Sequence, residues 1–195
     1  MYEKYGQFID GKWHKSSTGE TYEVINPANE EIIGKASKAS PEDVDKALLS
    51  AQKGLEVWKK TPPWQRAYIL RRIADKMREK QDILAKWMTL EVGKPFAEAK
   101  GEVNGAADIY EWNAEETKRI YGQTVESRFE DTRVHVYYQP VGVVAALVPW
   151  NFPLVLSARK ISTALAAGCS VIVKPDVITP GVVMEQVEIC RECGA

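Results

Sequence analysis

A run of eight residues without a polar side chain, Val141 to Val148, constrains the fold of this chain more than any other feature. The run is far shorter than the ~20 apolar residues that span a bilayer, so it predicts a buried strand. Pro149-Trp150-Asn151-Phe152-Pro153 follows it directly. Ordinary turns contain at most one proline, so two prolines and two aromatic rings predict a stiff turn that holds Asn151 in one place.

The residues after this turn alternate between helical and strand-like patterns. We expect a helix from about Pro153 to Ala167, an apolar strand over Ser170–Val173 and a helix from about Pro180 to Cys193. Neither strand alternates polar with apolar residues, which is typical of a parallel sheet covered on both faces. The predicted fold class is therefore α/β, with an incomplete Rossmann-like parallel sheet over residues 141–195.

Short hairpins and a helical bundle are predicted before this sheet, over residues 1–121. Residues 7–35 alternate short apolar stretches with turn pairs such as Asp10-Gly11, which indicates β-hairpins. Residues 40–121 show helical periodicity, starting at the capping sequence Ser40-Pro41-Glu42-Asp43, with later helices ending at Gly93 and near Ile120. We assign the apolar stripes of the first two helices to the core: Val44, Ala47, Leu48, Ala51, Leu55 and Trp58, then Trp64, Ala67, Leu70, Ile73, Ala74 and Met77.

Charge and cysteine content exclude several classes of partner. The net charge is −1, from 26 basic and 27 acidic residues, so we expect no binding to nucleic acid or to an anionic membrane. The start lacks the apolar core of a signal peptide, and three cysteines make no disulfide framework, so we expect a cytoplasmic protein. Cys190 and Cys193 form a CxxC pair at a helix end without a second pair, so no metal site is predicted.

Polar residues follow both predicted strands at the point where each ends. Asn151 comes after the first strand, and Lys174 with Pro175 comes after the second. Ligands of parallel α/β sheets bind outside the carboxyl ends of the strands. The sequence therefore predicts a binding site at this edge.

Several motifs together resemble the amino-terminal portion of the aldehyde dehydrogenase superfamily. They are FIDGKW, INPANEEIIGKAS, PPWQRAYILRRIADKM, LEVGKPFAEAKGEV, PWNFP and ALAAGCSVIVKP. The resemblance covers essentially the whole chain and is closest to succinate-semialdehyde dehydrogenase-like members. It implies NAD(P)-dependent oxidation of an aldehyde to a carboxylic acid through a cysteine thiohemiacetal and a thioester. In the family the catalytic cysteine and glutamate follow later, so we expect them beyond residue 195.

The resemblance assigns Asn151 as the catalytic residue of this chain, a side-chain amide that donates to the developing alkoxide. The alternative is an asparagine that caps the helix starting near Pro153. Lys174 corresponds to a lysine that holds the adenosine ribose of NAD or NADP, and the alternative is a solvated surface lysine. Where the family usually has a glutamate this chain has Val177, which does not repel a 2′-phosphate. The cofactor-binding set is Val148, Pro149, Trp150, Lys174, Pro175 and Val177.

Phe152 and Arg159 are the predicted substrate-binding residues. By resemblance Phe152 lines the aldehyde tunnel, although both it and Trp150 are equally consistent with core aromatics. Arg159 lies three residues past Leu156, near the same helix face, and an arginine here grips the second carboxylate of a semialdehyde. The alternative is an arginine that satisfies backbone carbonyls between subunits or packs beside Lys160.

Residues 122–140 are predicted to form an oligomerisation arm. Arg133 to Tyr137 alternate as a strand, and the family places here a protruding hairpin that adds to a neighbouring sheet. We therefore expect a homo-oligomer, a dimer or a tetramer, and the alternative is an ordinary surface hairpin. The competing function for the whole chain is a non-catalytic fragment that binds nucleotide or a partner subunit.

Overall fold

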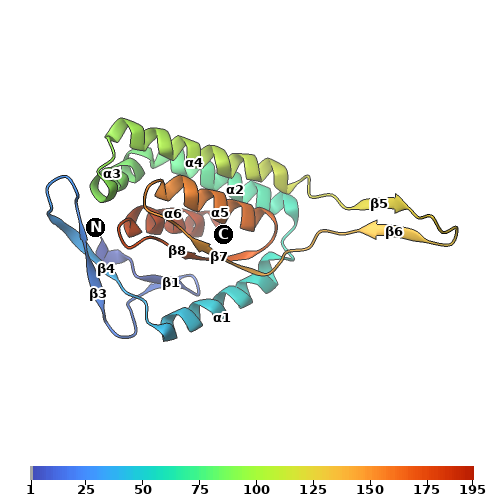
Figure 1. Ribbon diagram of the computed structural model, residues 1–195, viewed down its shortest axis with the longest axis horizontal. Coiled ribbons are helices and arrows are strands. Elements are labelled where there is room, and N and C mark those ends of the chain that lie inside the picture. Colours follow the sequence, from blue (N-terminus) through green and yellow to red (C-terminus); the bar gives the residue numbers. More distant parts are fainter. Residues whose placement is uncertain (1) are drawn as a thin grey trace.

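The computed structural model describes residues 2–195 and starts with a 3₁₀ turn, Tyr2–Lys4, and two antiparallel hairpins (Figure 1). The expected hairpin turn at Asp10-Gly11 has both residues at positive φ, 49° and 75°, as a two-residue turn requires. The paired strands are β1 (Gln7–Ile9) with β2 (Lys12–His14), and β3 (Thr21–Ile25) with β4 (Ile32–Ser37).

Four helices follow, and their ends are set by local hydrogen bonds. The Ser40 hydroxyl accepts the Asp43 N–H at 3.2 Å while the Asp43 carboxylate accepts the Ser40 N–H at 3.0 Å, a complete capping box. Gly93 ends the third helix at φ 75°. The fourth helix ends at Thr117, before the expected Ile120, because bonds to carbonyls three residues back tighten its last turn. The helices are α1 (Pro41–Trp58), α2 (Pro63–Glu79), α3 (Gln81–Val92) and α4 (Phe96–Thr117).

The expected parallel sheet is present as two strands, each followed by a helix. Pairing runs in register from Val143 opposite Ser170 to Leu147 opposite Lys174. Burial on both faces, however, is not seen, since the Leu147 side chain is 65% exposed. Two strands, about 5 Å apart, give the flanking helices little width to pack on, so the faces of this sheet are only partly covered. The elements are β7 (Val143–Leu147), α5 (Pro153–Ala166), β8 (Ser170–Lys174) and α6 (Pro180–Cys193).

Part of the predicted helical core is wrong. In α1, which packs against β7 and β8, Val44 is 47% exposed and Leu48 is also exposed. An 18-residue helix is about 27 Å long, far longer than a two-stranded sheet is wide, so much of its apolar stripe stays uncovered. Trp64 is 74% exposed in the first turn of α2, and the Lys118 ammonium lies 5.2 Å from the centre of its ring.

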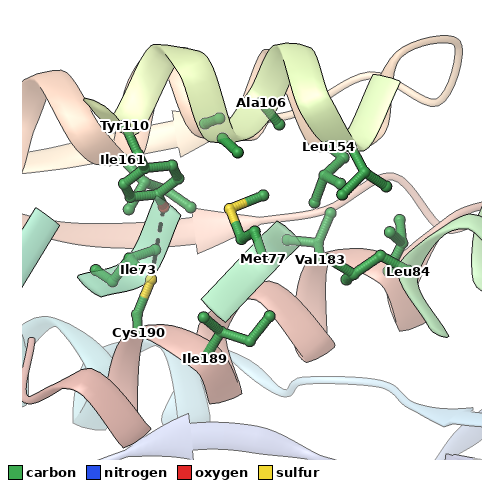
Figure 2. Packing of buried hydrophobic residues seen from close by; sticks show 14 of the residues in the cluster. Ile73, Met77, Leu84, Ala106, Tyr110, Leu154, Ile161, Val183, Ile189 and Cys190 are labelled. Carbon is green, nitrogen blue, oxygen red and sulfur yellow. Dashed lines mark hydrogen bonds between the residues drawn. The ribbon is translucent and has the colours of Figure 1, made fainter. Parts of the chain in front are cut away.

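The main core lies between α2, α3, α4, α5 and α6 (Figure 2). Of the remaining predicted residues of α2, Leu70, Ile73, Ala74 and Met77 belong to this cluster, and Ala67 is also buried. A polar contact crosses this core, because the Tyr110 hydroxyl lies 3.5 Å from the Cys190 sulfur. Burial raises the pKa of the Cys190 thiol to about 12, which makes it a poor nucleophile. Fully buried members of the cluster include Leu70, Ile73, Met77, Tyr110, Leu154 and Ile189.

A separate hairpin projects from the body of the molecule (Figure 1). It consists of β5 (Gln123–Glu126) paired antiparallel with β6 (Arg133–Val136), which includes the alternating segment predicted from the sequence. Val125 and Val134 face each other in register, and both are exposed. The hairpin therefore has apolar side chains that residues 2–195 leave uncovered.

Candidate functional site

The two turns that follow the parallel strands leave the sheet side by side. Beyond the last strand pair, the Val148 N–H donates to the Lys174 carbonyl at 3.0 Å. This bond extends the ladder up to the first residue of the stiff turn, Pro149. The predicted position of both polar motifs at one carboxyl edge is therefore confirmed.

A groove between α4 and α5 starts at this edge and has a volume of ≈ 540 Å³. Three predicted site residues, Asn151, Phe152 and Arg159, line it together. Leu156 lies between the last two on the same wall, as the helical spacing predicts. The remaining lining residues are Lys94, Glu98, Gly101, Glu102 and Val155.

The six predicted cofactor-binding residues lie at the strand ends and do not line this groove. Val148 is buried, whereas Lys174 and Val177 are exposed. The Lys174 ammonium makes no ion pair within residues 2–195, so it is free to meet a polyhydroxyl or phosphate group at this edge. The contact of these residues with a nucleotide stays a prediction. The full set is Val148, Pro149, Trp150, Lys174, Pro175 and Val177.

The Asn151 side chain is exposed and makes no hydrogen bond within residues 2–195, whereas its backbone carbonyl accepts the Lys94 ammonium at 3.3 Å. The N-cap of α5 is Phe152, and no side chain caps it from within the turn. The alternative that Asn151 caps this helix is therefore wrong. Its amide remains available to donate into the groove.

The cap of α5 comes from a glutamate that the sequence reasoning did not single out. One carboxylate oxygen of Glu102, in α4, accepts the N–H groups of Leu154 at 3.0 Å and Val155 at 3.2 Å. Its other oxygen is ion-paired with Lys94. The signal was a carboxylate within an apolar helix face, beside Val103, which is an expensive position unless the charge is paired.

A second unrecognised glutamate caps α6 in the same manner. Glu91, at the end of α3, accepts the Gly181 N–H at 2.6 Å and the Val182 N–H at 3.1 Å. The Tyr2 hydroxyl donates to the same carboxyl group at 2.6 Å. Burial raises the pKa of Glu91 to about 7, although the three hydrogen bonds favour its ionised form.

The groups available for chemistry are amides, carboxylates and cations. Within residues 2–195, no three His, Cys, Asp or Glu side chains gather as a metal site requires. The three cysteines, Cys169, Cys190 and Cys193, are buried free thiols, as expected of structural residues. None of the helices in this part of the chain is long and apolar enough to cross a membrane.

Comparison with known proteins identifies relatives over almost the whole chain. The model of the family described as "Aldehyde dehydrogenase family" matches residues 13–195. Glutarate-semialdehyde dehydrogenase of Pseudomonas aeruginosa is 44% identical over 96% of this chain and 39% of its own length. Succinate-semialdehyde dehydrogenase [NADP(+)] GabD of Escherichia coli is 44% identical over 95% of this chain and 39% of its own length.

The fold is also that of solved relatives. A betaine aldehyde dehydrogenase from Staphylococcus aureus, solved in complex with NAD⁺, superposes with a TM-score of 0.95 and is 34% identical. The match covers 98% of this chain and 40% of that chain. The chain therefore spans about 40% of the length of the relatives it matches.

Proposed function

Since this chain belongs to the aldehyde dehydrogenase family, we propose that it is the amino-terminal part of an enzyme that oxidises a semialdehyde with NAD or NADP. The observation that carries the proposal is the groove in which Asn151, Phe152 and Arg159 meet. Two relatives with 44% identity are named for glutarate semialdehyde and succinate semialdehyde, aldehydes with a second, anionic end. We further place the protein in the cytoplasm, in keeping with its three free thiols.

Asn151 is the group of this chain that acts on the reacting carbonyl. When a cysteine thiolate adds to the aldehyde, the carbonyl oxygen becomes an alkoxide that needs a fixed donor. The free side-chain amide of Asn151 supplies one N–H from the edge of the groove. The three cysteines described above are buried, which argues against each of them as the nucleophile. By the family resemblance, the nucleophile and the glutamate base would belong to the part of the enzyme that this chain does not cover.

The cofactor would be held at the strand ends, where Lys174 is exposed and makes no ion pair with any of residues 2–195. Its ammonium suits the ribose hydroxyls, and Val177 carries no charge that would repel a 2′-phosphate. A nicotinamide bound there would supply the hydride acceptor that oxidation of the aldehyde requires. The residues proposed to hold it are Val148, Pro149, Trp150, Lys174, Pro175 and Val177.

Arg159 selects the anionic end of the substrate. Its exposed guanidinium lines the groove and makes no hydrogen bond to residues 2–195. The neighbouring Lys160, by contrast, donates to the Leu147 carbonyl. A guanidinium can bind a carboxylate through two parallel hydrogen bonds, which a simple alkanal cannot offer.

The proposal is tested by comparing succinate semialdehyde with butanal in the full-length enzyme and in Arg159→Leu. We expect the wild-type preference for the semialdehyde, in kcat/KM, to fall about 100-fold in the variant. Arg119→Leu, which removes an exposed arginine just after the end of α4, is the matched control. A wild type that prefers butanal, or an unchanged ratio in Arg159→Leu, overturns the assignment.

A non-catalytic fragment is the competing function, because the chain spans only about 40% of its relatives. Such a fragment would bind nucleotide or a partner subunit without turnover. Intact mass of the protein isolated from its own cells separates the two. A mass near 21.9 kDa supports the fragment and contradicts a longer enzyme.

We also propose that the β5–β6 hairpin is an oligomerisation arm within residues 122–140. Its projection from the body and its exposed Val125 and Val134 side chains fit a strand pair that adds to a neighbouring subunit (Figure 1). We expect deletion of residues 130–135 to convert the homo-oligomer to smaller species in sedimentation velocity. An unchanged sedimentation coefficient would identify the hairpin as an ordinary surface feature.

A further inference from the structure

The Lys94–Glu102 ion pair contacts residues on both sides of Pro153, the second proline of the turn that carries Asn151. The Lys94 ammonium bonds to the Asn151 carbonyl at 3.3 Å and lies 4.0 Å from the centre of the Phe152 ring. Glu102 binds the first free N–H groups of α5, at Leu154 and Val155. One ion pair therefore contacts the turn before its second proline and the helix after it.

Burial strengthens the attraction between Lys94 and Glu102. The side chains of Lys94 and Glu102 are 10% and 2% exposed, so water screens their attraction weakly. The negative carboxylate lies at the positive end of the α5 dipole, which favours it further. Lys94 stands just after Gly93, and Glu102 lies in α4, so the pair also ties the turn to a different layer of the fold.

The two prolines alone cannot fix the position of the turn relative to α4. Pro149 and Pro153 restrict their own φ angles, which stiffens the turn internally. They do not determine where the turn sits relative to α4, the opposite wall of the groove. Contacts from α4 and the segment before it set that distance directly.

We propose that Lys94 and Glu102 are positioning residues that hold the Asn151 amide at its working distance across the groove. The proposal rests on the proposed function, in which Asn151 donates to the alkoxide. A donor displaced by about 1 Å loses much of its effect on the transition state, while binding of the ground-state aldehyde changes little.

The hydrogen bonds of Glu102 allow positioning to be separated from simple helix capping. Both α5 N–H groups go to the same carboxylate oxygen, and Lys94 binds the other. Glu102→Gln can therefore keep the cap through its carbonyl oxygen while its NH₂ group replaces the oxygen that Lys94 needs. Lys94→Met removes the contacts to Asn151 and Phe152 directly.

In the full-length enzyme we expect Glu102→Gln and Lys94→Met each to lower kcat about tenfold, with KM for the aldehyde within about twofold of wild type. The double variant should be no slower than the slower single variant, because both substitutions break the same Lys94–Glu102 ion pair. Glu116→Gln and Lys100→Met, which alter other ion pairs of α4, are controls expected to keep wild-type kcat.

Amide hydrogen exchange gives a readout that does not need turnover. In Glu102→Gln we expect faster exchange at Leu156, whose N–H donates to the Phe152 carbonyl at 2.9 Å, with protection retained at Leu154 and Val155. Wild-type kcat and exchange in both single variants would overturn the proposal and leave the pair as a cap only. A wild type without aldehyde oxidation defeats the proposed function instead, and exchange at Leu156 still tests the Lys94–Glu102 brace.

Discussion

Helices α5 and α6 both follow a parallel strand, both begin at a proline and both take their cap from a glutamate in the helical layer. Their surroundings differ. The carboxylate at α5 is paired with an ammonium, and the turn before the helix is exposed at a groove. The carboxyl at α6 meets a tyrosine hydroxyl, and both Thr179 before the helix and Pro180 at its start are buried.

The difference shows that one capping device serves two purposes, depending on its second partner. The lysine neutralises Glu102 and braces a turn whose side chains stay open to a ligand. Tyr2 instead covers Glu91 with the amino-terminal segment, which closes the fold over α6. Removal of the Glu102 cap should therefore lower activity, whereas removal of the Glu91 cap should lower stability.

The largest effect is expected on stability, when Glu91, the cap of α6, is removed. Glu91→Ala leaves two buried N–H groups and the Tyr2 hydroxyl without an acceptor and should lower the free energy of unfolding by about 4 kcal/mol. Urea denaturation of the full-length protein measures this. The exposed Glu98, changed to alanine, should cost less than about 0.5 kcal/mol. A loss below about 1 kcal/mol for Glu91→Ala would mean that the α6 amides find other acceptors.

The exposed turn before α5 should affect turnover rather than stability. Asn151→Ala removes the donor at the groove and should lower kcat about 100-fold, equivalent to about 3 kcal/mol, with cofactor affinity nearly unchanged. Single-turnover measurement of thioester formation tests this directly. Asn104→Ala, an exposed amide on α4, serves as the control. An unaltered single-turnover rate in Asn151→Ala would rule out the oxyanion role.

The pH dependence of the free energy of unfolding tests the protonation of Glu91, the cap of α6. Burial raises the pKa of Glu91 from 4.5 to about 7, so the folded state holds a proton that the unfolded state releases between these values. The stabilising contribution is full below the lower value and is lost as pH rises through the higher one. Relative to Glu91→Gln, the wild type should lose about 2 kcal/mol between about pH 5 and pH 7.5. Parallel stability curves for the two proteins would contradict the raised pKa.

Local patterns were sufficient for most elements and for the family. The Ser40 capping box, the Asp10-Gly11 turn and the terminator Gly93 act within a few residues, so the sequence shows them directly. The PWNFP motif likewise carried the resemblance that the family match confirms. Periodicity failed where coverage depends on distant layers, as for Trp64 and the stripe of α1.

The sequence by itself determined that a stiff turn follows an apolar strand, that Asn151 stands in it and that Arg159 falls on the same helix face as Leu156. Only the tertiary structure decided what caps the following helices and what braces the turn, because Lys94, Glu102 and Glu91 are about 50 to 90 residues away from their partners in the chain. Such pairings depend on how layers pack, whereas helical spacing and turn chemistry depend on neighbouring residues alone.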